Sequence, residues 1–383
     1  MKILFDYSVF EQQTIGGVSR YFSEIISHLN KDISAGIGIK YSNNIYLTEK
    51  QLLKVLPIID YRQEFIKGYE FKGKGRLFKM VKKLNPSKYP NCSQLNLQFS
   101  INLLKNQDFD VFHPTQFNTY FLEYIHNKPF VITVHDMIHE LFPEYYAPDN
   151  KTAFYKKELI KRANHIIAVS DNTKNDIINF YGVNEDKITV IHHGVNLPHK
   201  AIDNNFLPAK KYLLYVGARE GYKNFIFFVR AVSDLLIANN LQLICTGTPF
   251  NKMELELFKM LHLENRVLFY YADDTVLASL YQNALCFISP SLYEGFGMPI
   301  LEAFSNNCPV ALSDSSCYPE IAGDAALYFN PKKENEIKQT VLSIINNESL
   351  RKQLISSGRE RLNLFSWEKS AEKTIFVYRS VLS

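Results

Sequence analysis

The stretch that decides the fold reads Ser291-Leu292-Tyr293-Glu294-Gly295-Phe296-Gly297-Met298-Pro299-Ile300-Leu301-Glu302-Ala303. It follows an apolar run, Cys286–Ser289, that is typical of a buried parallel strand, and it leads into a helical pattern with Pro299 near its start. Gly295 and Gly297 permit a tight turn with exposed backbone N–H groups. A glycine turn at a helix N-terminus is suited to bind a pyrophosphate, so we expect an anion site at this edge of the sheet.

Two acids and two cations are placed around this turn. Glu294 precedes it and Glu302 lies about one turn inside the helix, so one acid can reach a hexose and the other a ribose, whose hydroxyls donate to carboxylates. Arg219 and Lys223 follow the expected strand Tyr212–Val216 at the same edge. A cation at a helix N-terminus is unfavourable without an anionic ligand. The alternative to a ligand-binding role is a local capping or pairing contact for Glu302 and ordinary exposure to solvent for Lys223.

Strand-like and helix-like segments alternate along the chain, which predicts an α/β fold with parallel sheets. The expected helices include Lys223–Ala238 and one that is capped by Ser170 and ends near Tyr181. The pattern breaks at 197–211, a candidate linker and hinge. We therefore expect two Rossmann-like, doubly wound domains, residues 1–197 and residues 198–365. Residues 366–383 predict an additional helix, and the first domain is a candidate partner for its apolar stripe. Expected strands before the break are Lys2–Phe10, Asp110–Pro114, Val131–Val134, His165–Val169 and Ile188–Ile191; those after it are Tyr212–Val216, Leu241–Cys245, Val267–Tyr271, Cys286–Ser289 and Pro309–Leu312.

Composition excludes several classes of protein. The chain has 383 residues, and its five cysteines lack metal-type spacing, which favours reduced thiols in a cytoplasmic protein. It has no signal-peptide pattern and no apolar run of about 18 residues that would span a membrane.

Residues 62–88 hold nine basic residues against two acids, with apolar and aromatic residues between them. This segment suits contact with the anionic inner face of the cell membrane or binding of a phosphate-bearing acceptor. The alternative is that it forms an ordinary solvated surface. Nucleic acid is disfavoured because no basic stripe occurs elsewhere.

Glu294 and Glu302 form an E-x7-E motif, and the chain resembles the retaining glycosyltransferases of family 4. These have the GT-B fold, in which two Rossmann-like domains face a cleft. The resemblance implies that residues 1–197 form the acceptor-side domain and residues 198–365 the domain that binds the sugar nucleotide. The resemblance covers essentially the whole chain. The chain is similar in particular to bacterial members that add mannose or related sugars during O-antigen and capsule assembly. The segments that carry it, besides the motif, are Gly16-Gly17-Val18-Ser19-Arg20-Tyr21, His135-Asp136, Ala168-Val169-Ser170, His193-Gly194-Val195, Lys223-Asn224, Pro319-Glu320 and Phe365-Ser366-Trp367-Glu368.

The resemblance implies a role for each matching residue. Arg219 and Lys223 would neutralise the leaving diphosphate, and Glu294 would bind the hydroxyls of the transferred sugar. Glu302 would hold the ribose, and Gly17 would let the first loop approach the donor. His135 would lie near the sugar, with a structural role as the alternative. Many members place the arginine where this chain has Ala218, so the role of Arg219 assumes a small shift of the loop. The backbone N–H groups expected around sugar and phosphate are those of Gly295, Phe296 and Gly297.

We expect no metal and no cofactor. The acidic pair Asp273-Asp274 lacks a metal partner, and Arg219, Lys223 and a helix N-terminus can stabilise the leaving group. The resemblance implies retention of the anomeric configuration by front-face attack. GDP-mannose is the favoured donor and a UDP-sugar the second, with a saccharide or lipid-linked acceptor. A non-catalytic subunit that binds nucleotide sugars is an alternative function that the sequence does not exclude. An epimerase or phosphorylase of this architecture is disfavoured, as is a dehydrogenase, because no GxGxxG follows the first strand.

Overall fold

The computed structural model describes residues 1–85, 88–195, 208 and 210–383. The chain divides into two compact units. Unit 1 consists of residues 1–133, 154–167 and 371–383, and unit 2 of residues 134–153 and 168–370. Most of the predicted linker at 197–211 lies outside the described residues, as do residues 86–87 of the basic segment.

Unit 2 contains a six-stranded parallel sheet with the strand order β12-β11-β10-β7-β8-β9. This is the order of a doubly wound nucleotide-binding fold, and it reverses between the neighbours β7 and β10. Apolar residues fill most positions of these short strands, since helices cover both faces. The bounds are β7 Tyr212–Tyr215, β8 Gln242–Cys245, β9 Val267–Phe269, β10 Cys286–Ser289, β11 Val310–Ser313 and β12 Leu327–Phe329.

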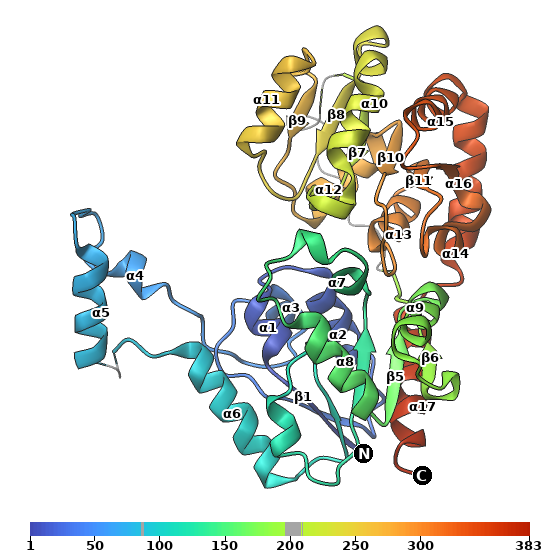
Figure 1. Cartoon of the computed structure of the whole chain (residues 1–383). Coiled ribbons are helices and arrows are strands. Elements are labelled where there is room, and N and C mark those ends of the chain that lie inside the picture. The colour runs from blue at the N-terminus through green and yellow to red at the C-terminus, as the bar shows by residue number, and fades with distance from the viewer. Residues whose placement is uncertain (86–87, 196–207, 209) are drawn as a thin grey trace. The chain divides into compact units, whose positions relative to one another are not determined.

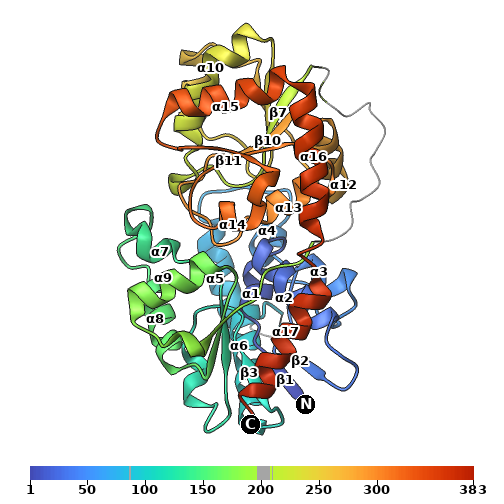
Figure 2. The same ribbon diagram turned by 90° about the vertical axis from the view of Figure 1, so that its right-hand side faces the viewer.

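The helices of unit 2 form two apolar layers on this sheet. One layer includes α10 and α15, which pack side by side (Figure 2). The other includes α13 and α14, whose Ile300 and Ile321 are buried against the opposite face. The bounds are α7 Ile138–Leu141, α9 Asp171–Tyr181, α10 Phe225–Ala238, α11 Lys252–Met260, α12 Asp274–Asn283, α13 Met298–Ser305, α14 Tyr318–Ala322, α15 Glu334–Asn346 and α16 Glu348–Leu362 (Figure 1).

Unit 1 contains a parallel sheet of order β2-β1-β3 (Ser34–Ile37, Lys2–Phe5, Val111–His113). A further sheet has the order β4-β5-β6 (Val131–Val134, His165–Ala168, Ile188–Val190), and its strand β6 belongs to unit 2. The buried Tyr378 of α17 bonds with its hydroxyl to Nδ1 of His113, at 2.7 Å, so the last helix packs on the β3 strand. The helices are α1 Ser8–Gln12, α2 Gly17–Ser27, α3 Ile45–Glu49, α4 Tyr61–Glu64, α5 Lys74–Leu84, α6 Cys92–Asn106, α8 Thr152–Arg162 and α17 Trp367–Ser380.

Most expected strands differ from the observed ones by one or two residues at an end, and two differences in bounds have a clear local cause. The strand expected over Lys2–Phe10 ends at Phe5, and a helix occupies Ser8–Gln12. The cause is Asp6, whose buried carboxylate accepts from the N–H and hydroxyl of Ser8 and so turns the chain. The helix expected from Lys223 begins at Phe225, because Asn224 adopts a left-handed conformation with φ of 58°. By contrast, Ser170 caps α9 as predicted, with its side chain accepting from the N–H of Thr173.

The described residues contain no helix that is both long enough and apolar enough to cross a bilayer.

Candidate functional site

Lys223 and Glu294 meet at the point where the strand order of the unit 2 sheet reverses. Lys223 ends a short helical turn that follows β7, and Glu294 lies in the loop that follows β10. Nζ of Lys223 donates to Oε1 of Glu294 at 2.6 Å, and the hydroxyl of Ser291 donates to the same oxygen at 2.7 Å. The two charged side chains are only 20% and 16% exposed. Ligands of open α/β sheets bind at such a reversal, so this pair lies where the fold places a binding site.

Two hydrogen bonds hold the glycine turn after Glu294 in place, one to the backbone of Glu294 and one to the backbone of Gly295. The N–H of Glu294 donates to the hydroxyl of Ser316, and the carbonyl of Gly295 accepts from the hydroxyl of Ser170 at 2.7 Å. Gly297 precedes α13 with a left-handed φ of 86°. Among the residues that the structure describes, no acceptor pairs with the backbone N–H groups of the turn, those of Gly295, Phe296 and Gly297. Together with the positive end of α13, these donors suit an anion.

His135 approaches the turn through its backbone. A Cβ atom on Gly295 would lie 1.7 Å from the carbonyl oxygen of His135, so only glycine fits there. The His135 ring stacks on His193, with centroids 5.8 Å apart, and His193 meets the ring of Phe296 edge-on at 4.5 Å. Burial, with His135 and His192 nearby, holds the pKa of His193 well below its usual value. His193 is therefore a neutral part of the packing around His135.

Arg219 has its own buried partner. Its Nε donates to Oε1 of Glu254 at 2.7 Å, and its Nη2 donates to the carbonyl oxygens of Thr248 and Pro249. The guanidinium also lies over the ring of Phe250, 4.8 Å from its centroid. Nη1 is buried and has no partner in the described parts of the chain. The structure thus joins Arg219 to Glu254 and Lys223 to Glu294, and the Nη1 donor is the part of Arg219 that a ligand could still engage.

Glu302 and Gly17 lie in different surroundings. Glu302 is part of α13, and the hydroxyl of Tyr281 donates to its Oε2 at 3.3 Å. Gly17 begins α2 in unit 1. The structure therefore joins Lys223, Glu294, the glycine turn and His135 by direct contacts within unit 2, whereas Gly17 belongs to the other unit.

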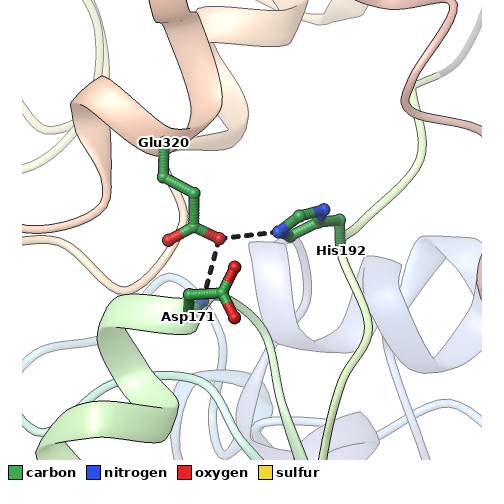
Figure 3. Close-up of side chains that lie close together, drawn as sticks. All are labelled: Asp171, His192 and Glu320. Atoms are coloured by element: carbon green, nitrogen blue, oxygen red, sulfur yellow. Dashed lines mark hydrogen bonds and ion pairs between the residues drawn. The ribbon is translucent and has the colours of Figure 1, made fainter.

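Asp171, His192 and Glu320 form a cluster that could offer ligands to a metal ion (Figure 3). Glu320 already accepts from Nε2 of His192 at 2.7 Å and from the N–H groups of Asp171 and Asn172 at the start of α9. Burial raises the pKa of the Glu320 carboxyl, but these hydrogen bonds outweigh burial and hold the pKa below its usual value. The carboxylate thus caps α9, and its lone pairs are largely used.

Sequence reasoning missed the hydroxyl groups that position the turn. Ser291, Ser316 and Thr173 all bond to Glu294 or Gly295, yet none was singled out. The spacing of Ser291 to Glu294 was a local signal that a side-chain contact was possible. Ser316 and Thr173 are 22 and 122 residues from their partners, so no local pattern could find them.

Two sequence families match the chain. The family described as glycosyl transferases group 1 matches residues 198–361, and glycosyltransferase family 4 matches residues 69–198. Together they cover both the described glycine turn and His135.

Curated relatives are similar over more than half of the chain. The O-antigen chain mannosyltransferase RfbU of Salmonella typhimurium is 31% identical over 56% of this chain, and the match spans 60% of the relative's length. The O-antigen chain mannosyltransferase B of Escherichia coli is 28% identical over 65% of this chain and 70% of its own.

A solved structure shares the fold over nearly the full length. HepE of Anabaena, crystallised with UDP and glucose, superposes with a TM-score of 0.72 at 17% identity and covers 99% of both chains. At this identity the likeness establishes the two-domain α/β fold alone.

Proposed function

We propose that this chain, which belongs to the glycosyltransferases, transfers a hexose from a sugar nucleotide to a saccharide or lipid-linked acceptor in the synthesis of a bacterial surface polysaccharide. Mannose is the favoured sugar because the curated relatives are mannosyltransferases. GDP-mannose is accordingly the favoured donor, with a UDP-sugar as the second.

The observation that carries the proposal is the Lys223–Glu294 pair beside three backbone N–H donors at the sheet reversal. A diphosphate would take Lys223 as its counterion and accept from the turn, and the released Glu294 carboxylate would accept from sugar hydroxyls. Glu302 would hold the ribose. Nη1 of Arg219, buried beside Phe250, would be a further donor after a small movement of its loop.

The proposed chemistry retains the anomeric configuration. The bond from the anomeric carbon to the leaving phosphate oxygen breaks, and the acceptor hydroxyl oxygen bonds to the same face of that carbon. The hydroxyl proton passes to the leaving phosphate. Lys223 changes its partner when the donor binds. From then on, Lys223, the N–H groups of the turn and the start of α13 stabilise the charge on the leaving diphosphate.

We propose that this transfer needs no divalent metal. The cations and N–H donors around the turn supply the positive charge that a metal would supply. The cluster of Asp171, His192 and Glu320 is a weak rival, because the Glu320 carboxylate is occupied by the start of α9. Full activity in a chelator is expected, and dependence on added magnesium or manganese would contradict the proposal.

We also propose peripheral contact with an anionic membrane through α5, within residues 62–88. Leu77, Met80 and Leu84 are exposed and recur at helical spacing, so they form one apolar stripe. Lys83 and Arg76 border this stripe, where lysine and arginine can reach lipid phosphates.

Variants of the central pair test the transferase activity. Glu294→Gln and Lys223→Ala should each lower kcat with a panel of sugar nucleotides by about 100-fold or more, since each removes a charge that acts in the transition state. Lys223→Ala should also weaken nucleoside diphosphate binding. The matched control is the exposed pair Lys252–Glu256 on α11, whose variants Lys252→Ala and Glu256→Gln should leave activity unchanged.

The outcomes separate the candidate functions. Product anomers identified by NMR spectroscopy should keep the donor configuration. Near-normal rates of Glu294→Gln and Lys223→Ala would remove these residues from the site. Nucleotide-sugar binding without transfer or donor hydrolysis by the unchanged chain would instead favour the non-catalytic binding subunit.

A further inference from the structure

A cavity of about 730 Å³ opens beside α5 in unit 1, within the range of about 300–1,000 Å³ typical of ligand pockets. Its wall includes Phe78, and its lining contains no carboxylate. The charged lining residues are Arg62, Lys72, Arg76, Lys79 and Lys82.

Aromatic contacts hold the elements that form this cavity. The ring of Phe78 on α5 lies 5.3 Å from Phe65, which follows α4, and 5.6 Å from Tyr89. Tyr89 in turn contacts Tyr61 of α4 at 5.6 Å. The guanidinium of Arg62 lies against Gly75 on α5, 3.4 Å from where a Cβ atom would be. The packing between α4 and α5 therefore brings Arg62 to the basic residues that lie on α5 and directly before it.

The nearby acids are already engaged with other groups. Glu64 pairs with Lys67 at 2.9 Å, and Glu70 pairs with the buried Lys74 at 2.8 Å. The carboxylate of Asp60 accepts from backbone N–H groups at the start of α4. In the described part of the chain, the five cations of the cavity form no ion pair with a carboxylate. The cavity thus gathers positive charge that the protein itself does not neutralise.

We propose that this cavity binds the diphosphate of a lipid-linked acceptor. Two arginine forks and three lysines match the oxygens and charge of a diphosphate, and Phe78 offers an apolar wall to the first carbons of a lipid. Gly75, Lys79 and Lys82 recur at helical spacing on a different face of α5 from Leu77, Met80 and Leu84. A membrane on the apolar stripe would therefore leave the cavity accessible. The inference rests on the proposed function for the identity of the acceptor.

Calorimetric titration of the full chain tests the cavity without donor or turnover. Every titration uses the Lys223→Ala background, so that the donor site contributes little. The probes are inorganic pyrophosphate and geranyl diphosphate, which separate a free diphosphate from a lipid-bound one. The pocket variant is Lys79→Glu with Lys82→Glu, and the control with equal charge change is Lys31→Glu with Lys54→Glu, two exposed lysines elsewhere in unit 1.

The pocket variant should raise the Kd of both probes at least about tenfold, the control should not, and geranyl diphosphate should bind more tightly than pyrophosphate. Equal increases in Kd in the pocket variant and in the control variant would show that the probes respond to net charge alone, and would overturn the proposal. Pyrophosphate binding as tight as that of geranyl diphosphate would overturn the lipid assignment. If the glutamates unfold α5, Lys79→Gln with Lys82→Gln should still raise both Kd values. Because no step needs a sugar nucleotide, failure of the cavity and failure of the transferase are separate results.

Discussion

Gly295→Ala offers the sharpest test of the glycine turn. The added Cβ would lie 1.7 Å from the His135 carbonyl oxygen and 2.8 Å from its carbon, both backbone atoms that no side-chain rotation can move. Non-bonded heavy atoms are comfortable at about 3.5 Å, so the two backbones must separate by roughly 1.8 Å. Overpacking of this kind costs about 1–3 kcal/mol of stability. A misplacement of about 1 Å in a site that positions substrate can cost about 100-fold in rate.

The measurements are transfer rate, nucleoside diphosphate affinity and the free energy of unfolding in urea. Gly295→Ala should remain folded but lose about 100-fold or more in rate, because the N–H groups no longer point at the diphosphate. Gly36→Ala is the matched control: its Cβ would meet Leu4 at an ordinary 3.5 Å. That control should keep full activity. A Gly295→Ala chain with the activity and stability of the unchanged protein would refute the close approach and the site built on it.

Two further predictions follow from the buried arginine and the exposed helix. Arg219→Met should lower the free energy of unfolding by about 3–5 kcal/mol, because it leaves the buried Glu254 carboxylate without its counterion; an unchanged urea midpoint would contradict the pair. Met80→Glu, in the middle of the exposed stripe of α5, should lower the fraction of protein that floats with anionic vesicles. Equal flotation of the variant and the unchanged chain would exclude that stripe as the membrane contact.

Local patterns in the sequence predicted much of the fold. The runs Val131–Val134 and Cys286–Ser289 are strands with the expected bounds, and Ser170 caps a helix that ends at Tyr181. These features depend on apolar runs, periodicity and caps, which neighbouring residues determine. The strand expected over Lys2–Phe10 was wrong beyond Phe5, because Asp6 is held by Thr115, over 100 residues away, as well as by Ser8.

The site likewise has features that the sequence predicted and contacts that only the fold determines. Residue types and spacing alone placed Glu294, the glycine turn and Lys223 after strands of one sheet, since the carboxyl ends of parallel strands share an edge. Only the tertiary structure paired Lys223 with Glu294, gave Arg219 a partner in Glu254 and brought the His135 carbonyl against Gly295. The physical reason is range: backbone preferences act over a few residues, whereas ion pairs and close packing depend on which distant segments the whole fold brings together.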